Sequence, residues 1–237
     1  RKESSAASDV YKRQSLYYSK VEDYWRKYYA NVNWALPISD NQGLVFDFNI
    51  YDTKSEGSAE YRAFDGEKLD NRAFSLSGAY NIGAHTFTLA YQKVTGDGDY
   101  GYGIDGGGTI FLANSVARSD FNAEDEKSWQ ARYDLNFAEY GIPGLTFMTR
   151  YVRGSDANVA GTTNGKEWER DVDIKYVLQE GPAKDLSFRV RQATYRSSDG
   201  VYYDSPSIDE LRLIVEYPLS ILSVSYTHLR AHETPEH

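Results

Sequence analysis

Apolar and polar side chains alternate with a period of two along most of this chain. The alternation predicts β-strands, because successive side chains of a strand point to opposite faces. Most of the predicted strands exceed the roughly 5–6 residues usual in globular proteins and reach the about 9–11 residues of a tilted strand that crosses a bilayer. The nine predicted strands are residues 22–36, 43–54, 72–80, 85–95, 126–139, 145–154, 167–178, 186–196 and 208–219.

Short and long connections between these strands alternate along the chain. Tight turns carrying Gly, Pro, Asn or Asp are expected at residues 37–42, 81–84, 141–144 and 179–185. Polar linkers rich in Gly and Asp are expected at residues 53–71, 96–125, 155–165 and 197–207. Regular alternation of short turns and long loops is typical of outer-membrane porins.

The two faces of the predicted strands differ in character. One parity is apolar and suits lipid: Leu44, Phe46, Phe48, Ile50, Phe87, Leu89, Tyr91, Trp129, Ala131, Tyr133, Leu135, Phe137, Val172, Ile174, Tyr176, Leu178, Leu211, Leu213, Val215 and Tyr217. The other is polar and suits a water-filled lumen: Asp47, Asn49, Thr88, Gln92, Gln130, Arg132, Asp134, Asn136, Asp171, Asp173, Lys175, Arg189, Arg191, Arg212 and Glu216. Because Arg or Lys facing lipid at mid-membrane costs about 2–4 kcal/mol, such clean alternation is expected of a membrane barrel.

A soluble antiparallel sheet with one wet face would show a similar alternation and stays open as the alternative. Such a binding module would fold without detergent. Nine is an odd number of strands, however, and an antiparallel barrel cannot close from an odd number without a parallel seam. The segment is therefore expected to be about half of a larger barrel.

Composition excludes several other classes of protein. The chain has 237 residues and a net charge of −9, which disfavours nucleic-acid binding because a phosphate partner requires clustered cations. The absence of cysteine excludes disulfides and thiolate metal sites. No run of about 18 apolar residues occurs, so no membrane-spanning helix is expected.

Nothing in the chain indicates an enzyme, a metal site or a cofactor. His85 opens a strand beside a turn, and a position beside a turn explains it without catalysis. Asp171 and Asp173 share a face but are not distinguished from other lumen-parity residues. Ser115 has no identifiable base, and the Gly-rich run at 96–109 precedes neither a helix nor a Lys-Ser/Thr pair.

The two ends of the chain differ from its middle. Residues 1–14 and 223–237 resemble translated sequencing-adaptor sequence, and three of the four histidines (His228, His232 and His237) lie in the second of these ends. Both ends are therefore excluded from the expected fold. The expected porin segment is residues 15–222.

Several long stretches of the segment resemble the C-terminal half of OprD-type porins. They are LANSVARSDFN (112–122), EKSWQARYDLNFAEYGIPGLTFMTRYV (126–152), WERDVDIKYVLQEGPAKDLSFRVRQATYR (168–196) and LRLIVEYPLSIL (211–222), with GAHTFTLAYQKVTGD (83–97) and VFDFNIY (45–51). The resemblance implies an all-β fold: an antiparallel transmembrane β-barrel of 18 strands, monomeric when complete, of which about the last nine are present.

The function implied by this resemblance is selective, passive uptake of small anionic or zwitterionic solutes that carry a carboxylate, such as amino acids, peptides or aromatic acids. It further implies the outer membrane of a Gram-negative bacterium, contact with lipid and lipopolysaccharide, and insertion by the barrel assembly machinery.

The resemblance also implies a ladder of basic residues along the pore wall. The matching positions are Arg189, Arg191 and Arg212, and the alternation adds Arg132, Arg150, Lys175 and Lys27. A guanidinium offers a carboxylate two parallel hydrogen bonds, and several such sites in series let an anion pass from one to the next. Symmetric pairing about residues 179–185 would instead place Asp171 near Arg191 and Asp173 near Arg189, so that charges neutralise each other.

The long linker 96–125 is the second candidate region. The resemblance implies a loop that folds into the barrel and narrows it, with Ser115 and Asp120 at constriction positions. The chain departs from the basic-amino-acid-selective members at Gly106–Thr109, where they carry an acidic residue, and at Arg118, where they carry an aromatic one. These departures put a preference for basic amino acids in doubt. Ordinary packing on the surface is the alternative for this loop.

Overall fold

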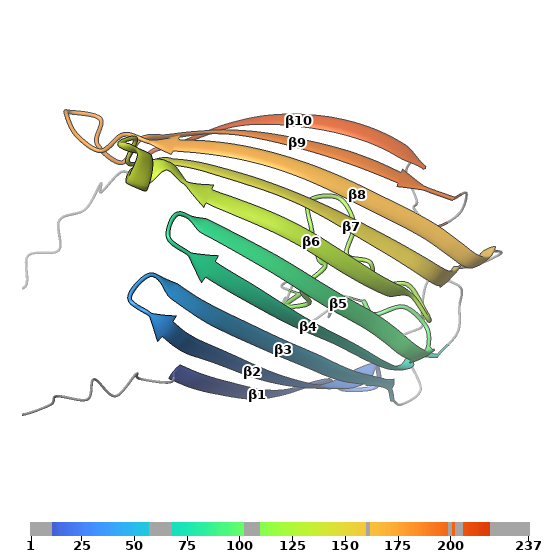
Figure 1. Cartoon of the computed structure of the whole chain (residues 1–237). Helices are drawn as coiled ribbons and strands as arrows, with labels where there is room; N and C mark the ends of the chain where they lie inside the picture. Colours follow the sequence, from blue (N-terminus) through green and yellow to red (C-terminus); the bar gives the residue numbers. More distant parts are fainter. Residues whose placement is uncertain are drawn as a thin grey trace, which may run out of the picture.

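One curved antiparallel sheet makes up the structure. The computed structural model describes residues 11–56, 68–101, 110–159, 162–198, 201 and 206–218. Ten strands pair in sequence order, each with its neighbours in the chain, and β1 and β10 form the two edges (Figure 1). The strands are β1 (Tyr11–Val21), β2 (Trp25–Ser39), β3 (Gln42–Ser55), β4 (Asp70–Ile82), β5 (His85–Asp97), β6 (Lys127–Asn136), β7 (Leu145–Val159), β8 (Thr162–Val177), β9 (Ser187–Ser197) and β10 (Ser207–Glu216).

The strand count corrects the prediction by one. The nine predicted strands correspond to β2–β10, and β1 is the addition, paired with β2 from Tyr11 opposite Ala35 to Val21 opposite Trp25. The alternation had missed β1 because its outward positions include Lys12 and Gln14. Because the sheet has ten strands, the argument that an odd number of strands cannot close an antiparallel barrel no longer applies. Residues 11–14, assigned to a foreign end, belong to this strand.

Several predicted boundaries were wrong, and two of them have a clear structural cause. The linker expected at 155–165 is mostly strand, because β7 and β8 stay paired through two register shifts near Ala157. Asp156 and Asn164 adopt positive φ there (65° and 57°), so the polar residues that suggested a loop occupy irregular positions of two long strands. At the other end, the strand expected to reach residue 139 stops at Asn136, whose side chain accepts a hydrogen bond from Ala138 N and caps a 3₁₀ helix, η1 (Phe137–Tyr140).

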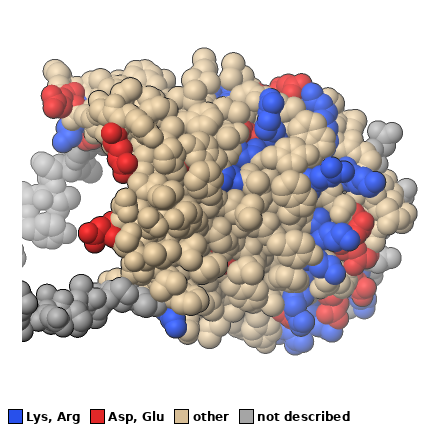
Figure 2. Space-filling view, viewed as in Figure 1, with Lys and Arg blue, Asp and Glu red and all other residues tan. Residues whose placement is uncertain are grey.

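The register confirms the two faces. Leu89 lies opposite Gly78 and Ala131, and the apolar parity of neighbouring strands continues on the same outer face. This face leaves large apolar side chains uncovered: Leu89 is 69% exposed and Leu213 74%. Figure 2 shows a broad uncharged expanse there, with Lys, Arg, Asp and Glu gathered toward the long-loop edge. Such a continuous apolar surface needs an apolar environment.

The concave face is the polar one. Its fully or nearly fully buried side chains include Asn49, Ser75, Gln92, Ser128 and Glu169. A smaller apolar cluster of Tyr51, Ala73, Val94, Tyr100 and Leu112 lies on the same side. The polar and apolar sides are therefore reversed relative to a soluble protein, as in a barrel with a wet interior. No helix in the described part of the chain is long and apolar enough to span a membrane.

Aromatic residues gather at the short-turn edge. His85 Nδ1 lies 2.8 Å from Tyr133 Oη, and His85 Nε2 lies 3.1 Å from Tyr140 Oη in η1. Tyr217 follows β10 and donates to Pro182 O at 3.4 Å. Trp168 lies within β8, away from this edge, and stacks on Tyr151 with ring centroids 5.8 Å apart. His85 thus belongs to an aromatic rim.

Candidate solute pathway on the concave face

The segment between β5 and β6 lies against the concave face. Its described part, residues 98–101 and 110–126, is called the interior segment here and appears inside the curve of the sheet in Figure 1. Inward side chains of three successive strands bind its backbone: Tyr51 Oη accepts from Phe111 N (3.1 Å), Ser75 Oγ from Ala113 N (3.0 Å) and Gln92 Oε1 from Asn114 N (2.9 Å). These bonds satisfy backbone groups that would otherwise be buried without partners.

Buried carboxylates hold the far end of the interior segment. Glu169 of β8 is fully buried, and its two oxygens accept from Arg118 N and Ser119 N, both at 2.9 Å. Arg118 Nη1 donates to Glu210 of β10 at 3.1 Å. Gly154 of β7 leaves room, since a Cβ at this position would meet Glu126 and Phe121. The interior segment therefore crosses the concave face from β3 to β10.

The three predicted loop residues lie in one turn of the interior segment. Ser115 Oγ donates a hydrogen bond to Asp120 Oδ1, and Val116 N donates to Ser119 O at 2.9 Å. Arg118, between them, is tied to β10 as described above. All three are partly exposed. The Gly-rich positions Gly106–Thr109 lie outside the described residues, as do most of the expected linker 53–71 and the histidines of the C-terminal end.

Two of the predicted basic residues share one carboxylate. Asp173 of β8 lies opposite Arg191 of β9. It accepts from Arg189 Nε at 2.7 Å and from Arg191 Nε at 3.0 Å. The Nη atoms of both arginines make no hydrogen bond to the described part of the chain, and the side chains are 30% and 21% exposed. The group carries two positive charges and one negative charge.

Of the other predicted basic residues, Arg150 and Arg132 are each paired with one carboxylate, whereas Arg212 shares Glu210 with Arg118. Arg150 donates to Asp171 at 2.6 Å in a nearly buried pair, and Arg132 holds both oxygens of Asp134. The remaining contacts are Arg212 Nε with Glu210 at 2.5 Å, Lys175 Nζ with Glu216 at 3.9 Å, and Lys27 Nζ with Gly101 O at 3.1 Å. Symmetric pairing of Asp171 with Arg191 was wrong: Asp171 lies opposite Ala193.

A hollow opens beside these charges at the short-turn end of the concave face. It has a volume of about 390 Å³, and its lining includes Arg132, Asp134, Asp173, Lys175 and Arg189. Charges from three strands, β6, β8 and β9, therefore meet at one surface. No group of three or more His, Cys, Asp or Glu within the described ranges is arranged to hold a metal ion.

Comparison with known proteins identifies the sheet. Residues 8–221 match the family model described as outer membrane porin, OprD family. The chain belongs to the OprD family of outer-membrane porins. The OprD-family segment is 52% identical over 228 residues to Porin D of Pseudomonas aeruginosa strain PAO1, an alignment that covers 88% of this chain and 50% of that protein. The segment thus spans about half the length of this curated relative.

Solved structures agree with the family. The crystal structure of P. aeruginosa OprD superposes with a TM-score of 0.80 at 48% identity, covering 92% of this chain and 59% of that one. P. aeruginosa OpdK, solved with vanillate, superposes with a TM-score of 0.78 at 33% identity, covering 88% and 52%. The family places the segment in the outer membrane of a Gram-negative bacterium. An outer-membrane barrel replaces the alternative of a soluble sheet.

Sequence reasoning missed the carboxylates that fasten the interior segment. Glu167 and Glu169 share the lumen parity of Asp171 and Asp173, which was the available signal. Glu126 precedes β6 and is fully buried, with Oε2 accepting from Ala123 N at 3.2 Å. Burial is the main cause that raises the pKa of Glu126 well above its usual range, and the neighbouring carboxyl of Glu167 raises it further. An acid at this position is easier to bury in its protonated form.

Replacing Glu126 by glutamine is expected to stabilise the fold at neutral pH. A carboxyl whose pKa is raised on folding stabilises the folded state while it is protonated. This contribution is complete below the unfolded pKa, about 4.3, and is lost as the pH rises from there through the folded pKa. The amide never ionises, so the gain from Glu126→Gln should be about 1–3 kcal/mol at pH 8 and smaller at pH 5. Urea unfolding in detergent micelles at the two pH values measures it. An equal effect at both would contradict this account.

Proposed function

We propose that this segment forms part of the pore wall of a porin for passive, selective diffusion of small carboxylate-bearing solutes, such as amino acids, peptides or aromatic acids. The observation that carries the proposal is the group of Arg189, Arg191 and Asp173. Two guanidinium groups are oriented by one carboxylate through their Nε atoms, which leaves a net positive charge and an Nη edge on each arginine, and Arg189 and Asp173 line the hollow. A carboxylate accepts hydrogen bonds from such an edge in two-pronged geometry.

The one-to-one pairs extend the polar wall without adding the same attraction. Arg132 and Arg150 each neutralise a carboxylate, whereas Lys175 has only a distant partner at 3.9 Å. We assign Lys175 and Arg212 to the same basic ladder, with Arg132 and Arg150 as weaker members. Several weak sites in series suit transport, because each must release the anion as well as bind it. The vanillate in OpdK is itself an aromatic carboxylate, in keeping with this solute class.

We assign the constriction to the turn that holds Ser115, Arg118 and Asp120. Its attachment to β8 and β10 keeps it across the concave face. Asp120 and the ladder arginines would then expose a solute to opposite charges. The complete porin is proposed to be a monomer that contacts lipid and lipopolysaccharide through its apolar outer face and is inserted by the barrel assembly machinery.

The proposal predicts a preference for carboxylates over their amides. In liposomes containing a complete porin that carries this segment, an N-acetyl amino acid should enter several-fold faster than its neutral amide. The double substitution Arg189→Gln and Arg191→Gln should abolish that preference, because both free guanidinium edges are lost. Liposome swelling measures the two entry rates. Arg170→Gln, which removes an exposed cation of β8, is the control and should retain the preference; equal rates for acid and amide in the unmodified porin would contradict the proposal.

A further inference from the structure

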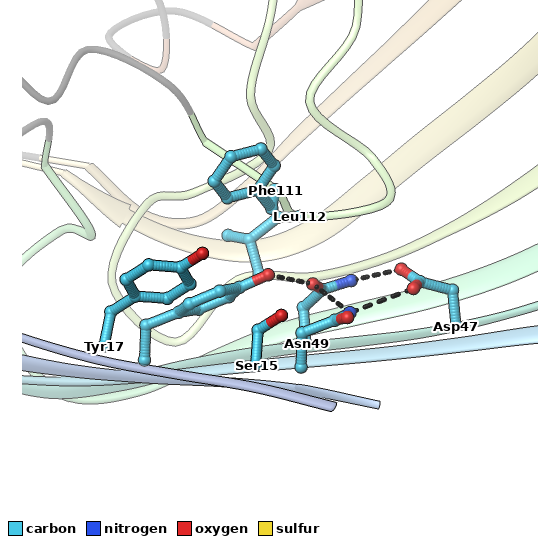
Figure 3. Close-up of a pocket in the computed structure, with 8 residues that line it drawn as sticks. Ser15, Tyr17, Asp47, Asn49, Phe111 and Leu112 are labelled. Atoms are coloured by element: carbon cyan, nitrogen blue, oxygen red, sulfur yellow. Dashed lines mark hydrogen bonds between the residues drawn. The ribbon is translucent and has the colours of Figure 1, made fainter. Parts of the chain in front are cut away.

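We propose that a second hollow on the concave face, away from the arginines, binds a primary ammonium group. The hollow has a volume of about 440 Å³ and lies between β1–β3 and residues Phe111 and Leu112 of the interior segment (Figure 3). The arginine group lies on β9 with its carboxylate on β8, so β4–β7 separate the two places along the sheet. The two hollows share no lining residue.

Asp47 is held in this hollow by amides. Its Oδ1 accepts from Asn31 Nδ2 at 2.9 Å and Asn33 Nδ2 at 3.1 Å, and its Oδ2 accepts from Asn49 Nδ2 at 2.5 Å. Asn49 Oδ1 in turn accepts from Tyr29 Oη at 2.7 Å (Figure 3). The amide N–H groups are used within this network, so the groups that the network leaves for a ligand in the hollow are mainly hydrogen-bond acceptors. The side-chain oxygens of Asn31 and Asn33 accept no hydrogen bond within the described ranges.

Asp47 differs from the inward aspartates of β6 and β8, which each hold a cation. Asp134, Asp171 and Asp173 each hold an arginine at 3.0 Å or less. Among the described residues, no Lys or Arg lies within ion-pair distance of Asp47, and Arg13, on the same face of β1, is exposed and forms no ion pair with it. A partly buried carboxylate that is oriented by three amides is a built acceptor for a positive charge.

Aromatic rings complete the hollow. The rings of Tyr17 and Tyr29 stack with centroids 5.8 Å apart, and Phe111 lies 5.6 Å from Tyr29. Outside the hollow, further along the concave face, aromatic rings already accommodate one ammonium: Lys27 Nζ lies 4.6 Å from the ring centroid of Tyr100 and donates to Gly101 O at 3.1 Å. Aromatic faces attract cations, and they do so more strongly where water is partly excluded.

A primary ammonium has the chemistry that these groups require. It offers three donors and no acceptor, which matches a hollow lined by amide and carboxylate oxygens. A carboxylate would be repelled by Asp47. A neutral sugar could bond to the Ser15 and Tyr17 hydroxyls that also line the hollow, but it would leave the charge of Asp47 uncompensated. The proposed ammonium site does not depend on the proposed function. The further step, in which the ammonium of a zwitterion binds here on its way past the arginines, rests on the proposed function.

Binding of ethylammonium chloride tests the site directly. Saturation-transfer NMR on a complete porin that carries this segment, in detergent micelles, should show saturable binding. Asp47→Asn should weaken that binding about tenfold or more, because the charge is lost while the shape is kept. Tyr17→Leu, at an exposed position of β1, should weaken it several-fold through loss of a ring. Asp52→Asn, on the outer face of β3 and paired with Arg72, is the matched control and should change nothing.

The outcomes separate this site from the proposed function. Unchanged binding in Asp47→Asn, no saturable binding of ethylammonium, or equal competition by glucose would each overturn the ammonium site. The double substitution Arg189→Gln and Arg191→Gln should leave ethylammonium binding intact while it abolishes the preference for carboxylates over amides. Loss of that preference in the arginine variant with retained ethylammonium binding supports the site. A porin that binds ethylammonium but never prefers carboxylates would contradict only the proposed function.

Discussion

Replacing Glu169 by alanine is expected to release the interior segment and raise the single-channel conductance several-fold. Glu169 accepts hydrogen bonds from the backbone of Arg118 and Ser119. Loss of these bonds leaves two N–H groups without their acceptor, which costs about 1–3 kcal/mol for each group that stays buried. The segment would then retain Glu210 and Glu167 as its contacts near β8–β10. Planar-bilayer recording of a complete porin that carries this segment measures the conductance.

Trypsin reports the same release independently. Cleavage after Arg118 should be slow in the unmodified porin, because the guanidinium of Arg118 and its backbone are both held, and about tenfold faster or more in Glu169→Ala. Glu180→Ala, in the exposed turn between β8 and β9, is the control. Unaltered conductance together with unaltered cleavage would show that Glu169 does not fasten the segment.

The 237-residue chain in detergent-free buffer is expected to aggregate almost completely. Its outer face exposes Leu89, Leu211 and Leu213 at 64% or more, and β1 and β10 present unpaired edges. Exposed apolar faces and open strand edges both promote association between chains. Sedimentation before and after transfer to detergent micelles measures the soluble fraction, which should recover in micelles. A folded monomer without detergent would contradict the membrane-facing assignment of the outer surface.

The alternation of side chains predicted the fold where one face was uniformly apolar. β3, β5, β8 and β10 were all found from it, because their outward positions carry Leu, Phe, Ile, Val or Tyr. It failed for β1, where Lys12 and Gln14 face outward, and around Ala157, where two register shifts carry turn-like residues through a continuous pair of strands. Alternation reports the environment of a face rather than the pairing of its backbone, so polar edge positions and bulges escape it.

The sequence indicated which residues form the candidate site, but not which of them pair with one another. The lumen parity indicated Arg189, Arg191 and Asp173, yet symmetric pairing about the turn assigned Asp173 to Arg189 alone. The actual register puts Asp173 opposite Arg191, from where it reaches both arginines. The register depends on the shape of the β8–β9 turn, residues 178–186, which composition does not determine. The amide network around Asp47 was missed for a similar reason, since its members come from β2 and β3 and meet only after pairing.

Charge reversal at the shared-carboxylate group tests the central claim most directly. In planar bilayers under a salt gradient, the reversal potential of a complete porin that carries this segment gives its anion-to-cation permeability ratio. Arg189→Glu together with Arg191→Glu changes the local charge from one net positive to three net negative, so the ratio should fall several-fold, more at low salt than at high salt. Arg170→Glu on β8 should leave it unchanged. An unaltered reversal potential in the double variant would contradict a solute pathway along these arginines.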